Sequence, residues 1–201
     1  TGGCMIFDLS YIINYDWWDY MKRVSLKPLE VSDAGEAYEV CRGTFREEYH
    51  ITEERILESL FEDPDFSAEE SKKIVDEKNG RMIGFIGVKV SHNEQLYPAS
   101  AWISIFAVKK EEQGKGYGTM VLNQVCQSLH KNGINKIYVG QDFNNFFSGI
   151  PDPDEGKEIF FKKNGFTLNR DRHFDLEADI TDNRLIDSFD TSSFVQISHS
   201  N

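Results

Sequence analysis

Three glycines at alternate positions, Gly114, Gly116 and Gly118, stand in the stretch EQGKGYGT, which joins an apolar run to a helix-like pattern. Glycine at such a joint lets the backbone turn sharply or approach a bound group closely. If the helix begins near Gly118, backbone N–H groups and the positive end of the helix face one concavity. Lys115 adds a positive charge and Thr119 a hydroxyl. This combination is suited to binding a pyrophosphate.

Three phosphate-loop patterns can be compared with this stretch. The P-loop requires G-x-x-x-x-G-K-[ST], and it fails because Lys115 is followed by Gly116. The dinucleotide fingerprint G-x-G-x-x-G fails on the spacing of the glycines. The third pattern is Q/R-x-x-G-x-G/A between a strand and a helix, and Gln113, Gly116 and Gly118 match it in full. A glycine-rich turn that holds no ligand is the alternative to an anion site.

The elements next to this loop follow from hydrophobic periodicity. The run AWISIFAV predicts a strand before the loop, and apolar residues at helical spacing over 117–129 predict a helix after it. Gly133 is placed to end that helix. Downstream, NKIYVG predicts a strand and GKEIFFKKNG a short helix that ends at Gly165. The segments FTLN and HFDLEAD predict a closing hairpin.

The elements upstream begin with a short strand, RVSLKPLE. The capping-box spacing of Asp33 and Glu36 predicts a helix over about 33–49. Thr52 can cap a second helix. The Asn79-Gly80 pair predicts a hairpin turn between the strands KKIVDE and MIGFIGVKV. The order of elements predicts a mixed α/β fold around one sheet.

Composition narrows the class of protein. The chain has 201 residues, 39% of them hydrophobic and 13% aromatic, which predicts one globular domain. No apolar run approaches membrane-spanning length and no secretory leader is visible, so we expect a cytoplasmic protein. The net charge of -12 argues against nucleic-acid binding. A net negative charge suits a cationic substrate, but a charge that only keeps the protein soluble explains the composition equally well. Three widely spaced cysteines without C-x-x-C or H-E-x-x-H argue against a metal site.

The domain boundaries are expected at changes in composition. Residues 1–20 are predicted to form an N-terminal extension or an added leader, residues 21–180 the domain, and residues 181–201 a C-terminal extension. The aromatic N-terminal segment YIINYDWWDY and the sheet edges are compatible with a homodimer.

The region from Ala101 to Phe166 resembles the GNAT superfamily of acetyl-CoA-dependent N-acetyltransferases. The resemblance is carried by the strand WISIFAV, the loop QGKGYG with its helix, and IFFKKNGF, where Phe161 stands four residues before Gly165-Phe166. It extends over roughly residues 22–178. It implies an α/β (α+β) fold with a single mixed, mostly antiparallel sheet flanked by helices. It also implies acetyl-CoA as co-substrate, an amine as acceptor and no metal.

The resemblance also implies roles for particular residues. The backbone N–H of Phe106 would face the acetyl carbonyl as an oxyanion donor, and Val108 would bond the pantetheine arm. Ala107 and Phe161 would line the same path. The pyrophosphate would be held by Gln113, Gly114, Lys115, Gly116, Tyr117, Gly118 and Thr119.

Two departures from the family's pattern concern proton transfer. The glutamate of the histone-acetylating branch is replaced by Trp102, four residues before Phe106. The tyrosine general acid of many members is replaced by Phe161, which has no proton to give. The candidate replacements for these acid and base groups are Tyr138, Asp142 and His173, and a structural role is the alternative for each.

The segment NNFFSGIPDPDE is a longer connection than usual, and long loops in compact domains are often functional. Phe146, Phe147 and Ile150 could form the wall of an acceptor pocket, while Asp152 and Asp154 could attract a cation. The alternative is a loop folded back on the core with Asp152 or Asp154 as an N-cap.

The leading hypothesis is therefore an N-acetyltransferase that moves the acetyl group of acetyl-CoA to a primary amine of a small molecule by direct attack. The alternatives are a protein or peptide N-acetyltransferase, a non-catalytic acyl-CoA-binding regulatory module, and an interaction domain without a ligand.

Overall fold

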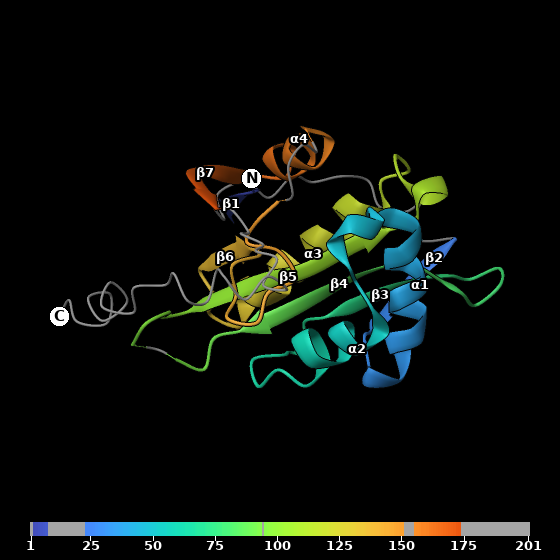
Figure 1. Cartoon of the computed structure of the whole chain (residues 1–201), viewed down its shortest axis with the longest axis horizontal. Coiled ribbons are helices and arrows are strands. Elements are labelled where there is room, and N and C mark those ends of the chain that lie inside the picture. The colour runs from blue at the N-terminus through green and yellow to red at the C-terminus, as the bar shows by residue number, and fades with distance from the viewer. Residues whose placement is uncertain (1, 8–22, 94, 151–154, 174–201) are drawn as a thin grey trace, which may run out of the picture.

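The computed structural model describes residues 2–7, 23–93, 95–150 and 155–173. Its centre is a seven-stranded sheet with the order β2-β3-β4-β5-β6-β1-β7 (Figure 1). Neighbouring strands are antiparallel except β5 and β6, which are parallel. The predicted mixed, mostly antiparallel sheet is thus confirmed. The strands are β1 (Gly2–Phe7), β2 (Val24–Pro28), β3 (Lys72–Asp76), β4 (Met82–Val90), β5 (Ser100–Val108), β6 (Lys136–Val139) and β7 (Phe166–His173).

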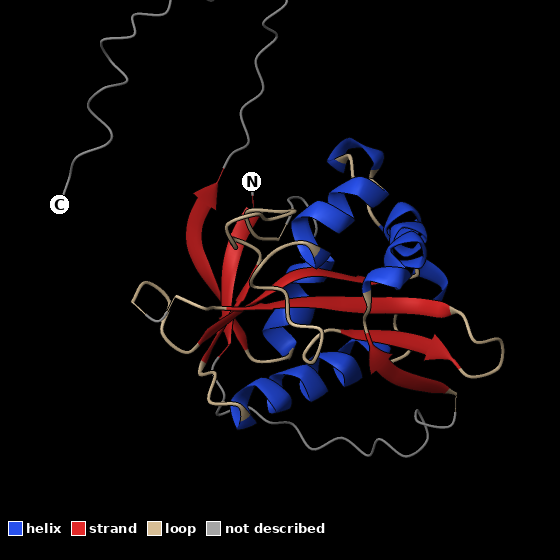
Figure 2. Cartoon of the chain, turned by 90° about the horizontal axis from the view of Figure 1, so that it is seen from below, coloured by secondary structure: helices blue, strands red, loops and turns tan. Residues whose placement is uncertain are grey.

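Helices cover both faces of the sheet, as Figure 2 shows. One face carries α1 (Ala34–Thr44) and α2 (Glu53–Ile56), which continues as a π-helical turn over Leu57–Phe61. The other face carries α3 (Tyr117–Lys131), and the side chain of Phe161 from α4 (Glu155–Lys163) joins its core. Each helix buries an apolar stripe, and the two faces form two separate clusters of buried side chains.

The beginning of α1 differs from the predicted capping box. The box is formed by Glu30 and Asp33, in a 3-10 turn that precedes the helix, and the N–H of Glu30 donates to Asp33 Oδ2 at 2.9 Å. Glu36 cannot complete a box with Asp33 because its carboxylate accepts from the N–H of Met82 on β4 at 3.3 Å. The predicted Asp33–Glu36 pair is therefore wrong, since a contact distant in sequence holds Glu36.

The helix predicted over about 33–49 also ends earlier, at Thr44. Phe45 leaves the helical conformation with φ −89° and ψ 163°. Its ring packs against Phe147 with centroids 5.2 Å apart. Residues 47–49 form a separate 3-10 turn. The contact with Phe147 thus accompanies the break in the helix, and it brings the end of α1 to the loop after β6.

Three local turn predictions are confirmed. Thr52 caps α2, because its Oγ1 accepts from the N–H of Arg55 at 3.1 Å. Gly80 has φ +69° in the turn that joins β3 and β4, and its N–H donates to Asp76 at 2.8 Å. Gly133 has φ +83° just after α3. These signals act over a few residues, so the sequence alone is enough to find them.

The predicted closing hairpin is wrong. Residues Phe166–His173 form one continuous strand, β7, and all of HFDLEAD after His173 lies outside the described residues. The partner of β7 is β1, with pairs from Phe7↔Phe166 to Gly2↔His173. Both ends of β7 pair with β1, with a register shift between Gly3 and Met5, so the chain continues as one strand without a turn near residue 170. Part of the expected N-terminal extension is therefore a strand inside the sheet, whereas residues 181–201 lie outside the described part.

Candidate functional site

A bulge in β5 changes the direction of its side chains. Val88 of β4 pairs with Ile103, and the preceding residue, Gly87, pairs with Ile105, so Ser104 has no partner in the register. Ile103 packs with the α3 side of the core, whereas Ile105 packs with the α1 and α2 side. A bulge of this kind bends a strand and redirects its side chains. Here it places Ser104 at the point where β5 leaves its other neighbour, β6.

The parallel pairing of β5 and β6 covers only part of β5. The pairs run from Ser100↔Lys136 to Ile103↔Val139, and the N–H of Gly140 then donates to the carbonyl of Ile103 at 2.9 Å. Beyond this point β6 ends and β5 continues to Val108. The two strands therefore leave an open slot beside the second half of β5.

The backbone N–H groups of Phe106 and Val108 face this slot. The N–H of Lys109 donates to the carbonyl of Ile83 on β4 at 2.9 Å. Because successive residues of a strand point to alternate sides, the N–H groups of Phe106 and Val108 point away from β4. The carbonyl of Val108 accepts from Gln113 Nε2 at 2.8 Å, which ties the start of the glycine loop to the slot.

The glycine loop forms the N-terminus of α3. Gly114 and Gly116 have φ of +73° and +84°, a region in which a Cβ is strained. Gly116 is the N-cap and no side chain caps the helix, which begins at Tyr117. The first N–H groups of an α-helix have no partner within the helix itself. Lys115 Nζ lies 3.0 Å from Glu112. The predicted strand–loop–helix arrangement is confirmed.

Aromatic rings from α4 close over the slot. Phe160 and Phe161 pack against Phe106, with ring centroids 5.8 and 6.3 Å apart. A Cβ added at Gly118 would lie 3.4 Å from the ring of Phe160 and 3.5 Å from Phe106. Glycine at this position therefore lets α3, α4 and the second half of β5 approach one another.

A small cavity lies in the slot. It is lined by β5 from Ile103 to Phe106, by the loop after β6, and by side chains from the end of α1 and from α4, among them Phe45, Phe147, Ile150, Lys157 and Phe161. The Ser104 hydroxyl is buried and has no hydrogen-bond partner among the described residues. Lys157 is the one ionisable residue in this lining. Ser104, Lys157 and Phe45 were not among the site residues predicted from the sequence.

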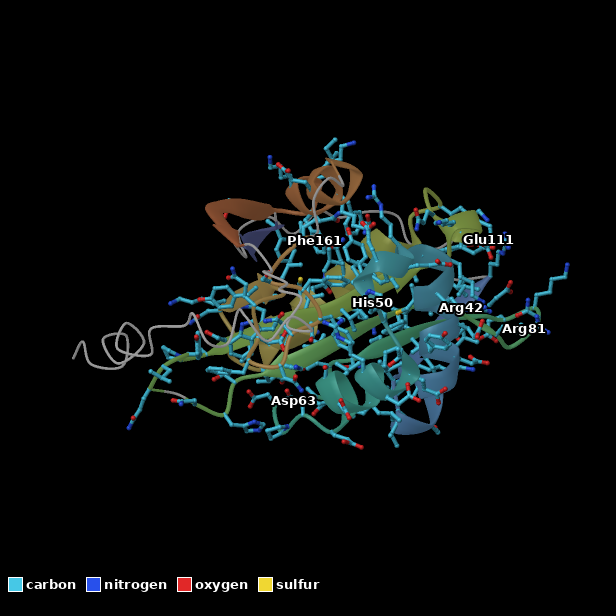
Figure 3. The ribbon with its side chains drawn as sticks, viewed as in Figure 1. Arg42, His50, Asp63, Arg81, Glu111 and Phe161 are labelled. Atoms are coloured by element: carbon cyan, nitrogen blue, oxygen red, sulfur yellow. The ribbon has the colours of Figure 1, made fainter. Side chains whose placement is uncertain are left out.

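The loop after β6 is held by a buried lysine. Lys89 of β4 is 1% exposed and forms ion pairs with Asp63, at 2.9 Å, and with Asp142. Figure 3 shows Asp63 next to α2. Lys89 Nζ also donates to the carbonyl of Asn144 at 3.2 Å. Since Asp142 and Asn144 belong to the loop, Lys89 ties one wall of the cavity to β4 and to the end of α2.

Gly140→Ala is expected to disturb the same loop. Gly140 has φ +67°, and a Cβ there would lie 2.5 Å from the carbonyl oxygen of Phe147 and 2.8 Å from the nitrogen of Gly149. We expect the free energy of unfolding, measured in urea, to fall by about 1–3 kcal/mol. Gly80→Ala is the matched control, because Gly80 has φ +69° but no atom within 4 Å of an added Cβ. Equal losses in both variants would contradict close packing at Gly140.

Two of the predicted catalytic side chains, Tyr138 and Asp142, lie away from the cavity. Tyr138 stacks on Trp102, with centroids 6.0 Å apart and planes at 25°. Asp142 is 3% exposed and paired with Lys89. The backbone of His173 pairs with Gly2 at the end of β7. Tyr138 and Asp142 do not line the cavity, whereas the side chain of His173 and the whole of Asp152 lie outside the described part of the structure.

The remaining predicted residues divide between the slot and the core. Phe106, Phe147 and Phe161 meet at the cavity. Phe146 packs with the α1 and α2 side of the core, where Arg55 donates to its carbonyl at 3.0 Å. Ala107 is buried in the same cluster. Its N–H alternates with those of its neighbours and points toward β4.

Two buried cysteines are poor nucleophiles. Burial raises the pKa of Cys126 to about 12, and it raises the pKa of Cys41 further above the ordinary value. A thiol attacks as its thiolate, so neither side chain is set up for covalent catalysis near neutral pH. In the described part of the chain, no three His, Cys, Asp or Glu side chains are grouped to hold a metal ion. Across the same residues, no helix combines the length and apolar character needed to cross a membrane.

Comparison with protein families gives one match. The sequence model of the Acetyltransferase (GNAT) family matches residues 35–148, which is more than half of the chain. The match includes β5, the glycine loop, α3 and β6. No curated protein matches the chain.

Comparison with solved structures gives similar folds at low identity. The glucosamine N-acetyltransferase region of a fungal multi-domain GH3 β-N-acetylglucosaminidase aligns with TM-score 0.64 and 20% identity, over 74% of this chain and 17% of that chain. The ribosomal-protein-S18-alanine N-acetyltransferase from Escherichia coli gives 0.55 and 16%, over 72% and 77%. The paia N-acetyltransferase from Thermoplasma acidophilum, solved with coenzyme A, gives 0.57 and 18%, over 74% and 92%.

Proposed function

Because the chain belongs to the GNAT family of acetyltransferases, we propose that it moves the acetyl group of acetyl-CoA to a primary amine of a small molecule. The observation that carries the proposal is the slot beside β5. The N–H groups of Phe106 and Val108 face it, and the helix N-terminus formed by Gly114 to Gly118 lies at its end. Backbone donors in this row suit an extended ligand whose anionic group lies at the glycine loop.

The residues present fit acetyl-CoA along this row. The pyrophosphate would lie against Gln113 to Thr119, where Gly114 and Gly116 adopt the left-handed conformation and α3 has no side-chain cap. The pantetheine arm follows Val108, and the acetyl carbonyl reaches the N–H of Phe106. The buried, unpartnered hydroxyl of Ser104 lies next to this end and offers one more polar contact. A ligand identified as coenzyme A in a structural neighbour supports this assignment.

We propose that the acetyl group is transferred by direct attack of the amine. The amine nitrogen attacks the acetyl carbon, and the negative charge that develops on the carbonyl oxygen is stabilised by the N–H of Phe106. The slot holds the two reactants in one geometry, which supplies much of the rate enhancement. In the proposed step the amine attacks as the free base, the carbon–sulfur bond breaks, and the nitrogen loses its proton to water.

A small acceptor suits the way the cavity is closed. Phe45 and Phe147 pack 5.2 Å apart at one side, and Lys157 Nζ lies 4.8 Å from the ring centre of Phe45. These side chains come from α1, from the loop after β6 and from α4, and together they narrow the space in front of Phe106. A narrow apolar wall favours a small molecule over an extended peptide.

Thermal unfolding with and without acetyl-CoA tests the proposed binding. At one hundred times its dissociation constant the ligand should add roughly 2.7 kcal/mol, and each kcal/mol should raise the midpoint by roughly 2–4 °C. We expect Gly116→Glu to abolish this shift, because it strains a left-handed residue and places a carboxylate at the anion site. Gly43→Glu is the matched control, since Gly43 is exposed and a Cβ there meets no atom within 4 Å.

The outcomes separate the alternatives. No shift at millimolar acetyl-CoA overturns the proposed function. A shift with no release of free CoA thiol across a broad amine panel indicates a binding module without turnover. Release of free CoA thiol with peptides but not with small amines would indicate that the acceptor is a protein and not a small molecule.

A further inference from the structure

Ser104 carries a buried hydroxyl that has no hydrogen-bond partner among the described residues. The residue is 2% exposed, and it belongs to the lining of the cavity. Ser100, which is also buried on β5, donates instead to the carbonyl of Pro98 at 3.0 Å. Buried polar groups are normally hydrogen-bonded, so an unpaired hydroxyl beside a cavity points to a partner that arrives with a ligand.

The pleat of β5 determines the side of the slot on which this hydroxyl lies. Trp102 pairs with Lys89, whose ammonium reaches Asp63 next to α2. Side chains alternate along a strand, so Ser104 follows Trp102 to the side of α1 and α2. Ile105, after the bulge, packs on that side as well. The hydroxyl therefore lies on the side of the sheet opposite to α3.

The two sides of the slot differ in what they can hold. Phe106 and Phe161 pack with the α3 side, which carries the glycine loop. Phe45 and Phe147 pack with the α1 and α2 side. If acetyl-CoA extends from the glycine loop to the N–H of Phe106, the acceptor reaches the acetyl carbon from the other side. Ser104 lies on the side from which the acceptor approaches.

The chemistry of Ser104 suits a neutral amine. Its hydroxyl is the one side-chain oxygen in the described lining of the cavity. An attacking amine uses its lone pair for the new bond, so its N–H groups need hydrogen-bond acceptors. Two residues of a strand span about 6–7 Å. An amine bound at Ser104 therefore lies within reach of an acetyl group held at the N–H of Phe106.

We propose that the hydroxyl of Ser104 binds the attacking amine, an inference that rests on the proposed function. Oγ accepts a hydrogen bond from one N–H and directs the nitrogen lone pair toward the acetyl carbon. The nitrogen–carbon bond forms, the carbon–sulfur bond breaks, and its electron pair leaves with the sulfur. The nitrogen loses its proton to water, the thiolate takes a proton from solvent, and Ser104 keeps its own. Because the nitrogen becomes positive during attack, its hydrogen bond to Oγ strengthens in the transition state.

Turnover by Ser104→Ala tests this role. The probes are the amine panel, which includes alkylamines from ethylamine to hexylamine and benzylamine, and the readout is release of free CoA thiol at saturating acetyl-CoA. We expect kcat/KM for the best of these amines to fall about tenfold to a hundredfold. The thermal shift with acetyl-CoA should stay unchanged, since the groups that bind the co-substrate remain. Ser104→Thr keeps a hydroxyl and should keep more activity than Ser104→Ala.

Thermal unfolding without a ligand separates this role from a structural one. Ser104→Ala removes a buried hydroxyl that has no described partner, so the unfolding midpoint should stay the same or rise. Ser100→Ala is the matched control, because it removes a paired hydroxyl from the same strand. The midpoint of the control should fall, while its kcat/KM should stay at the parent value.

The outcomes are distinct for the two proposals. If Ser104→Ala acetylates the amines as the parent does, the role of Ser104 is overturned while the acetyltransferase proposal stands. If the variant loses affinity for acetyl-CoA relative to CoA, the hydroxyl holds the acetyl carbonyl and the amine role is overturned. Lost activity together with a lower midpoint would indicate a structural role and would also overturn it. If the parent chain releases no CoA thiol with the amine panel, both proposals fail.

Discussion

Lys89→Met is expected to lower the free energy of unfolding by about 3–5 kcal/mol, because it leaves two buried carboxylates without their cation. Lys89 is 1% exposed, and the side chains of Asp63 and Asp142 are 9% and 3% exposed. Asp142 Oδ2 has no hydrogen-bond partner among the described residues, so Asp142 depends strongly on Lys89. Urea unfolding at neutral pH, followed by tryptophan fluorescence and circular dichroism together, measures the loss.

Two further variants show whether the buried charges cause this loss. Lys162→Met removes an exposed ion pair with Glu158 and should cost less than about 1 kcal/mol. The double variant Lys89→Met with Asp142→Asn should recover part of the stability, because one stranded charge is removed. If Lys89→Met lowers the free energy of unfolding as little as Lys162→Met does, the buried ion pairs do not hold the loop after β6.

The strand, glycine loop and helix could be predicted because their signals are local. Gly114 and Gly116 must adopt a left-handed backbone at the start of α3. Gln113 bonds back to Val108, only five positions earlier. Each requirement involves residues close in sequence or a conformation that glycine alone adopts readily, so a short pattern records it.

The other parts of the cavity depend on contacts between distant segments. The strand pattern WISIFAV contains no sign of the bulge at Ser104, because the bulge is defined by the pairing of β5 with β4. Lys89 occupies one polar position in an apolar strand, and its partners lie 26 and 53 residues away. The pairing of β7 with β1 joins the two ends of the described chain. Local propensity carries no information about such partners.

Lys157 was within reach of a sequence argument. It stands four residues before Phe161 in a predicted helix, and side chains at this spacing share one face. The sequence did not show which residues form the wall of the cavity opposite α4. Phe45 reaches that wall because α1 ends at Thr44, and Phe147 reaches it because the loop after β6 folds back and is held by Lys89.

Phe106→Pro is expected to lower kcat by about a hundredfold to a thousandfold, because it removes the proposed oxyanion donor. The N–H of Phe106 faces the slot and not β4, so a proline at this position removes no hydrogen bond between β4 and β5. We therefore expect a folded variant that still binds acetyl-CoA. Single-turnover kinetics with the acceptor found by the amine panel, together with the thermal shift, separate the loss of chemistry from the loss of binding.

Neighbouring positions on β5 provide matched controls. Val108→Pro removes the N–H assigned to the pantetheine arm, so it should weaken acetyl-CoA binding more than it lowers kcat at saturation. Ala107→Pro removes an N–H that points toward β4 and should destabilise the fold itself. Phe106→Leu keeps the N–H and should keep most of the activity. The expected effects thus alternate along β5, as the directions of the N–H groups do. A folded Phe106→Pro variant with unchanged kcat would show that the N–H of Phe106 does not hold the acetyl carbonyl.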